Sequence, residues 1–272
     1  MLSQMIVTAL LGFASLATAA KKCPVADVSA IAHTGTPVGK EVSYNGLTQY
    51  VSKPKGWSAR GNKTTGVLYL TDVFGIQLAQ NKLLADSFAR AGYVSVAPDL
   101  FNGSPAPNDI NIPGFNTTQF LAQHGPNVTD PIIANSIKYL REELRVDKVA
   151  VTGIASAVAI RSVSLPLARV LMSDLPRTRV CSPTMRSRPL LAPPVLPQQA
   201  SALYMQTDNL MSPARRAEVE TLLSETGQPF SVALYGGTSH GFAVRANISD
   251  PRQKFGKEEA FFQAVRFFDT WA

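Results

Sequence analysis

The sequence predicts one α/β domain in which a mostly parallel central sheet is flanked by helices. Its 272 residues are enough for one sizeable hydrophobic core. An apolar run at 66–71, a helical pattern at 81–91 and a second apolar run at 93–97 have the lengths of a right-handed crossover between parallel strands. Three further runs of strand length follow, at 148–152, 202–205 and 230–235.

The N-terminus carries the pattern of a secretory signal peptide. Residues 5–19 form an apolar run with small residues at Ala17 and Ala19, which is typical of an h-region followed by a cleavage site. The run is too short to span a bilayer. No Lys or Arg precedes it, so a buried N-terminal helix is the alternative. We therefore expect a signal peptide at 1–20, a mature domain at 21–272 without a membrane span, and a secreted protein.

Glycosylation motifs and cysteines fit an exported chain. Acceptor sequences that predict a glycoprotein begin at Asn62, Asn102, Asn116, Asn127 and Asn247. Cys23 and Cys181 are the two cysteines, and an oxidising compartment would allow one disulfide between them.

The net charge of +7 is concentrated in one segment. Residues 154–200 contain six Arg and one Asp, so the rest of the chain is close to neutral. A basic surface that recruits nucleic acid is therefore not expected.

Besides the strand at 93–97, the first half of the domain supplies two expected strand regions and a helix. Residues 42–51 alternate loosely, which fits a strand or a hairpin, and the Gly-, Lys- and Pro-rich residues 53–65 form a loop. The run at 66–71 is apolar throughout, as in a strand buried on both faces. Leu83, Leu84 and Phe88 have helical spacing within 81–91, which ends at Gly92.

A long excursion precedes the middle strand. Residues 102–129 are rich in Asn, Pro and Gly without a clear period, which is typical of a lid or pocket wall. Asp130 is expected to cap a helix through Leu144, with Pro131 at its first position.

The second half alternates strands and helices. The strand at 202–205 leads into Thr207-Asp208, and Ser212 caps a helix at 213–224. The strand at 230–235 leads into a glycine-rich turn, and residues 258–271 form the terminal helix.

The order of an acid and a base suits a hydrolase. Asp208 follows one late strand and His240 follows the next, as the acid and the base do in α/β hydrolases. A histidine near neutrality can accept a proton from a nucleophile and return it to a leaving group, while a carboxylate fixes its tautomer. The alternatives are a turn histidine at His240 and a capping aspartate at Asp208.

The turn that should carry the nucleophile lacks it. The strand at 149–152 runs into Gly153, but a G-x-S-x-G turn would need Ser where Ala155 stands and Gly where Ala157 stands. Ser156 is one residue late and has no Gly two positions beyond it.

Four motifs resemble the dienelactone hydrolase family, closest to its fungal members: Leu70-Thr71-Asp72-Val73-Phe74-Gly75, Ala97-Pro98-Asp99-Leu100-Phe101, Thr207-Asp208 and Ser239-His240-Gly241-Phe242-Ala243-Val244-Arg245. The likeness covers about residues 40–153 and 201–272, and it implies an α/β-hydrolase fold. It also implies that the substrate is a small ester or lactone, opened by a Cys-His-Asp triad with no metal or other cofactor.

The resemblance implies a role for each matching residue. Asp208 and His240 correspond to the acid and the base of the triad. Asp72 stands where the family usually has a Glu that interacts with the resting thiol, and the Asp side chain is shorter. The backbone N–H of Val73 would contribute to the oxyanion hole, and Arg245 would meet a substrate carboxylate.

The chain departs from the family after Gly153, where the family pattern is Gly-Tyr-Cys-Phe-Gly-Gly. Residues 154–200 lack Gly, aromatic residues, Glu and Lys, and their prolines exclude the long helix expected behind the nucleophile. A one-base shift of the possible codons from Gly153 onward permits the family string, with the Cys codon spanning Ile154 and Ala155. Our hypothesis is that this stretch was translated out of frame and that the register returns by Thr207. Cys181 would then be accidental.

Three interpretations of function remain open. The first is a secreted dienelactone-hydrolase-like enzyme whose sequence is damaged at the nucleophile. The second is a divergent serine esterase that uses Ser156. The third is a catalytically inactive relative that binds a ligand or partner with the pocket alone.

Overall fold

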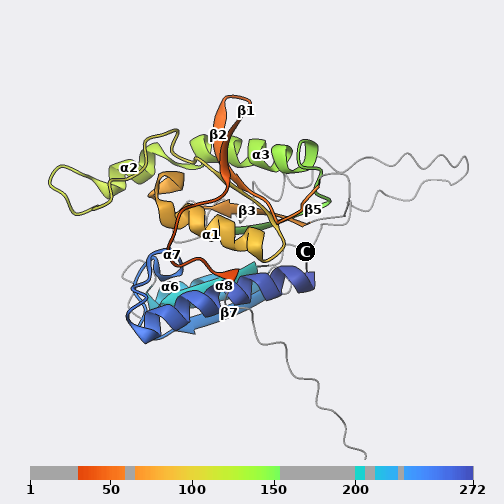
Figure 1. Cartoon of the computed structure of the whole chain (residues 1–272). Helices are drawn as coiled ribbons and strands as arrows, with labels where there is room; N and C mark the ends of the chain where they lie inside the picture. Colours follow the sequence, from red (N-terminus) through yellow and green to blue (C-terminus); the bar gives the residue numbers. More distant parts are fainter. Residues whose placement is uncertain (1–29, 59–64, 154–199, 206–211, 226–229, 272) are drawn as a thin grey trace, which may run out of the picture.

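The computed structural model describes residues 30–58, 65–153, 200–205, 212–225 and 230–271. Five strands form one mixed sheet in the order β1-β2-β4-β3-β5 (Figure 1). They are β1 (Lys40–Tyr44), β2 (Leu47–Ser52), β3 (Thr65–Leu70), β4 (Val94–Pro98) and β5 (Lys148–Gly153).

The sheet combines a hairpin edge with a parallel centre. Asn45 and Gly46 both have positive φ, 50° and 79°, as a tight hairpin turn requires, and they join β1 to β2. β2 runs antiparallel to β4, whereas β3 runs parallel to both β4 and β5. The expected parallel crossover is confirmed, and residues 42–51 belong to a hairpin.

Helices cover both faces of this sheet. α1 (Ala79–Arg90) and α8 (Pro251–Trp271) lie on one face, where Phe88 packs with Phe261 and Phe268. α3 (Pro126–Glu142) lies on the other face and buries Ile133 and Ile137 (Figure 1). Because side chains alternate along β3, the strand contributes to both layers, with Leu68 in one and Tyr69 in the other.

The last two strands form a sheet of their own. β6 (Ala200–Met205) pairs in parallel with β7 (Phe230–Tyr235), and within the described residues neither strand bonds to β5. Phe230 and Leu234 on β7 are 41% and 54% exposed. The single sheet expected from the sequence is therefore divided between β5 and β6. The chain that links them is the Pro- and Arg-rich stretch, which lies outside the described residues.

Two helices, α3 and α8, start earlier than expected. α3 begins at Pro126, so the prediction that Asp130 caps it with Pro131 first is wrong. Pro126 takes the first position, where a missing N–H costs nothing, and Pro131 lies inside the helix. α8 begins at Pro251, earlier than the expected residue 258, because Asp250 accepts a hydrogen bond from Arg252 N at its start. α6 (Pro213–Glu225) starts where expected.

Two short helices were not expected. α2 (Thr117–Gln123) lies in the excursion at 102–129, where the Asn116 side chain accepts a hydrogen bond from Gln119 N at 3.0 Å and caps it. α7 (Phe242–Arg245) follows β7 and begins after Gly241, whose φ is 81°.

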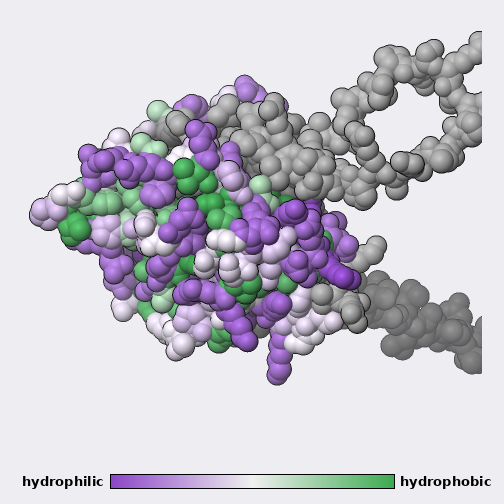
Figure 2. All heavy atoms as spheres, turned by 90° about the horizontal axis from the view of Figure 1, so that it is seen from above, coloured by the Kyte–Doolittle hydropathy of each residue, from purple (hydrophilic) through white to green (hydrophobic). Residues whose placement is uncertain are grey.

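The face of the described residues seen in Figure 2 is mainly hydrophilic. On the face seen in Figure 2, hydrophilic residues surround small separate apolar patches. Among the helices that the structure describes, none has the length and apolar character of a membrane span.

Candidate active site

A tight turn after β3 forms the first part of the candidate site. Gly75 N donates to the Asp72 carbonyl at 3.0 Å, and Gly75 has a φ of 62°. The positive φ favours glycine here, and a Cβ at Gly75 would also require the flexible end of the Gln77 side chain to move. The Val73 carbonyl accepts a bond from Ala106 N at 2.9 Å. No acceptor for the Val73 N–H is found within the described part of the chain.

The Asp72 carboxylate points into the protein and is held on both oxygens. It is 2% exposed. Oδ1 accepts hydrogen bonds from Phe74 N at 3.2 Å and from Asn81 Nδ2 at 2.8 Å. Oδ2 accepts a bond from Arg245 Nε at 3.2 Å. A carboxylate with three donors is fixed in place, and it fixes Arg245 in turn.

Arg245 joins the loop after β7 to the turn after β3. Its guanidinium lies 4.4 Å from the centroid of the Phe74 ring, over the ring face, while its side chain stays 33% exposed. Gly241 leaves room for it, because a Cβ there would lie 2.4 Å from Arg245 Nη2. Asp72 therefore anchors Arg245 at Nε, while about a third of the side chain stays accessible to solvent.

Asn81 connects the buried parts of this network. Its Nδ2 donates to Asp72 Oδ1 and to the Gly75 carbonyl, both at 2.8 Å, and its Oδ1 accepts a bond from the Tyr69 hydroxyl at 2.6 Å. Both Asn81 and Tyr69 are fully buried. Burial raises the pKa of Tyr69 well above its ordinary value, and the Asp72 carboxylate raises it further, so Tyr69 acts as a neutral donor.

His240 lies in the same loop as Arg245. Its segment is anchored by Thr238, which is 1% exposed and donates to the Tyr235 carbonyl at 2.8 Å. Phe242 N donates to the Ser239 carbonyl at 3.0 Å, which closes a turn around His240. The structure thus brings Asp72, Val73 and Arg245 together and places His240 in the same loop as Arg245. Asp208 and Ser156 lie outside the described residues.

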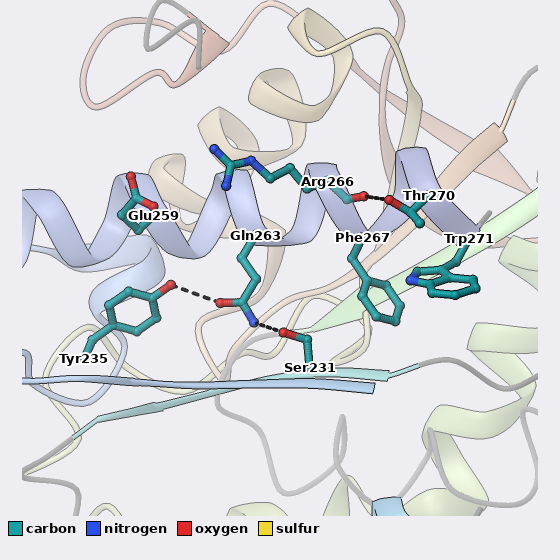
Figure 3. A pocket seen from close by; sticks show the side chains of 8 residues that line it. All are labelled: Ser231, Tyr235, Glu259, Gln263, Arg266, Phe267, Thr270 and Trp271. Atoms are coloured by element: carbon teal, nitrogen blue, oxygen red, sulfur yellow. Dashed lines mark hydrogen bonds between the residues drawn. The ribbon is translucent and has the colours of Figure 1, made fainter. Parts of the chain in front are cut away.

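A hollow of about 400 Å³ lies elsewhere, between β7 and α8 (Figure 3). Figure 3 shows the Tyr235 hydroxyl donating to Gln263 Oε1 and Gln263 Nε2 donating to Ser231 Oγ, at 3.1 Å each. Burial and the charge of Glu259 raise the pKa of Tyr235 to about 12. None of the candidate site residues lines this hollow, so we do not assign it to the reaction.

The described residues include no group of three or more His, Cys, Asp or Glu side chains placed to hold a metal ion.

Sequence reasoning did not identify Asn81, Tyr69 or Gly241 as parts of this site. The sequence did carry a signal for Asn81. It is a polar residue among the buried positions of α1, which Leu83 and Leu84 also occupy. Its partner, Asp72, could be identified only from the folded structure, which brings the two side chains together.

Comparisons with known sequences show which family the chain resembles. The sequence model of the dienelactone hydrolase family matches residues 47–272. A hydrolase named pyvD from Aspergillus violaceofuscus is 32% identical over 240 residues, covering 88% of this chain and 93% of that protein. Dienlactone hydrolase 1 of Gibberella moniliformis is 26% identical over 248 residues, covering 88% of this chain and 90% of that protein.

Solved structures support the fold alone. A dienelactone-hydrolase-like promiscuous phosphotriesterase from metagenomic libraries superposes with a TM-score of 0.60 at 15% identity, covering 87% of this chain and 99% of that chain. A putative dienelactone hydrolase from Klebsiella pneumoniae gives 0.56 at 17% identity, covering 84% and 98%. The predicted α/β-hydrolase fold is confirmed, and the chain belongs to the dienelactone hydrolase family, a family of ester and lactone hydrolases.

Proposed function

We propose that the locus encodes a secreted hydrolase that opens a carboxylic ester or lactone with a Cys nucleophile, His240 and Asp208. The observation that supports it best is the meeting of Asp72, Val73 and Arg245 beside the loop of His240. In this arrangement Arg245 takes an anionic group of the substrate. Val73 N–H has no acceptor within the described residues and is suited to bind a developing oxyanion.

The proposed reaction has two halves. The nucleophile, deprotonated by His240, bonds to the carbonyl carbon, and the carbonyl electron pair moves to the oxygen that Val73 N–H binds. The pair then returns, the bond to the leaving alkoxide breaks, and protonated His240 gives its proton to the alkoxide. In the second half His240 takes a proton from water and the hydroxide attacks the acyl carbon. The bond between that carbon and the nucleophile then breaks, and protonated His240 returns its proton to the nucleophile as the carboxylic acid leaves.

Asp72 has a different role in this proposal from the family's Glu. Both of its oxygens are engaged by Phe74 N, Asn81 and Arg245. We therefore assign it to anchoring Arg245 rather than to holding the resting thiol.

The nucleophile itself is tested by sequencing the transcript between the codons of Gly153 and Thr207. The frame hypothesis expects a message that encodes the Tyr-Cys-Phe-Gly-Gly string after Gly153. A spliced message that encodes the present residues without a shift would end that hypothesis.

An activity assay separates the three interpretations. The chain with the present sequence and a frame-restored chain are each tested on small aryl esters and lactones, with and without a thiol-blocking reagent. Turnover only by the restored chain, abolished by the reagent, supports the Cys enzyme. Thiol-insensitive turnover by the present chain that disappears in Ser156→Ala supports the serine esterase. No turnover by either chain refutes the proposed hydrolysis and leaves the binding interpretation.

We also propose that the protein is glycosylated during export. The described acceptor residues are all exposed: Asn102, Asn116, Asn127 and Asn247. Asn116 and Asn247 use Oδ1 to accept backbone hydrogen bonds, and a glycan attaches at the other atom, Nδ2. The protein is secreted from a eukaryotic host and then treated to remove N-glycans. We expect this treatment to lower its apparent mass. Retention inside the cell or an unchanged mass would contradict this proposal.

A further inference from the structure

A buried lysine lies next to the candidate site without belonging to it. Lys257 on α8 is 5% exposed, and its Nζ donates to the Val244 carbonyl at 3.0 Å. Burial lowers its pKa to about 8, although the nearby Glu258 carboxylate opposes that shift. Burying an ammonium group is unfavourable, and the hydrogen bond to the Val244 carbonyl offsets part of that cost.

The acceptor of this bond is the end of a very short helix. α7 spans only Phe242–Arg245, and the carbonyls of its last turn lack partners within the helix. A cation at a helix C-terminus satisfies such a carbonyl. Lys257 therefore closes α7 at the residue directly before Arg245, while Val244 is buried in the core at 1% exposure.

A second contact fixes the other end of the same loop. A Cβ at Gly256 would lie 2.6 Å from Thr238 Cγ2 and 3.2 Å from the ring of Phe242. α8 and the loop thus meet at a distance that only glycine permits. Gly256 and Lys257 together hold the segment 238–245, which carries both His240 and Arg245.

We propose that Lys257 is a positioning residue for the hydrolysis, acting by capping α7 and so holding Arg245 over Phe74 and against Asp72. The inference rests on the proposed role of Arg245 in the reaction. Lys257 does not touch the candidate site itself. Its role is to fix the backbone from which Arg245 extends.

The first test needs no activity. Amide hydrogen exchange is measured on the full chain, and on Lys257→Met, which replaces the ammonium with an apolar group of similar length. We expect exchange of the segment 242–250 to rise by about tenfold or more, since a charge-assisted hydrogen bond is lost, while the thermal midpoint stays the same or rises. Exchange in α1 should stay unchanged.

Three further variants sharpen this test. Lys254→Met is the matched control, because Lys254 is 47% exposed and pairs with Glu258 one turn away, and it should leave the segment 242–250 unaffected. Lys257→Gln keeps a donor and should restore part of the protection. Gly256→Ala, which keeps the lysine but pushes against Thr238, should loosen the same segment even if Lys257→Met fails to fold. Exchange that is unchanged in both Lys257→Met and Gly256→Ala, or that rises equally throughout the chain, overturns the proposal.

The second test is kinetic and uses whichever form of the chain is active. Lys257→Met should lower kcat/KM by about tenfold for an ester that carries a carboxylate, mainly through KM, and much less for a neutral ester of the same size. Equal losses on both esters would show that Arg245 is not what Lys257 positions. If Lys257→Met loosens the segment 242–250 but no form of the chain hydrolyses an ester, the capping role of Lys257 stands. The proposed hydrolysis is then refuted.

Discussion

Replacing Asn81 with Asp provides a direct test of the network around Asp72. The new carboxyl would take the place of an amide that donates to Asp72 Oδ1 at 2.8 Å. Two carboxylates at that separation repel by about 6 kcal/mol at an effective dielectric constant of about 20, equivalent to about four pH units. The buried pair should therefore share one proton from about pH 4 up to about pH 8.

The sign of the effect follows from proton binding. A carboxyl whose pKa is raised by folding contributes stability below its unfolded pKa of about 4, and this stability is lost as pH rises through the folded value. Relative to the wild type, the free energy of unfolding of Asn81→Asp should fall by about 1.4 kcal/mol per pH unit across this window. At the acidic end the protonated carboxyl can still donate to Asp72 and accept from Tyr69, so the substitution is mild there.

Urea unfolding followed by circular dichroism between about pH 4.5 and 8 measures this slope. Asn135→Asp is the matched control, since Asn135 is a partly buried helical residue that bonds Tyr44 O and Asn45 away from the site. The control should run nearly parallel to the wild type. If Asn81→Asp also runs parallel, Asn81 does not face Asp72 as described, and the account of the anchored carboxylate is wrong.

Other expectations follow from single contacts. Gly241→Ala should destabilise the fold by about 1–3 kcal/mol, because φ is 81° and the new Cβ meets Arg245, and a thermal melt should show the loss. Burial lowers the pKa of Lys257 from 10.5 to about 8, so the unfolded chain binds more protons between those values. The free energy of unfolding should then rise with pH in this window, by at most about 3 kcal/mol, and urea titrations of Lys257→Met should lack the rise. Asp86→Ala should cost about 3–5 kcal/mol in urea unfolding, because the buried carboxylate accepts bonds from Tyr50 and from two backbone N–H groups before β1, and an unchanged midpoint would contradict this.

Strands and helix faces could be predicted from sequence wherever burial alone decides them. The uninterrupted apolar run at 66–71 predicted a strand covered on both sides, and β3 is such a strand. Helix starts were less predictable, because two prolines, Pro126 and Pro131, each fit a first position. In the structure α3 begins at Pro126, and Pro131 lies inside the helix, which buries Ile133 and Ile137.

The site residues that belong to family motifs could be predicted from the sequence. Those that act through tertiary contacts could not. Asp72 and Arg245 were found from the resemblance, but their direct ion pair joins residues far apart in the sequence and depends on how β3 and β7 end. Lys257 gave no signal, since it stands just before the helix predicted at 258–271, where a lysine is ordinarily solvated. The roles predicted for Asp208, His240 and Ser156 stay predictions, with Asp208 and Ser156 outside the described residues.

The packing of α8 against the first sheet has a consequence for biosynthesis. The strands β1–β5 are complete once residue 153 has left the ribosome, yet the aromatic layer around Phe88 closes only when Phe261 and Phe268 arrive from the last helix. Until α8 has been synthesised, part of the apolar face of this sheet in the nascent chain stays uncovered. Premature termination anywhere before α8 should therefore yield an aggregating fragment and a client for chaperones, rather than a smaller soluble protein.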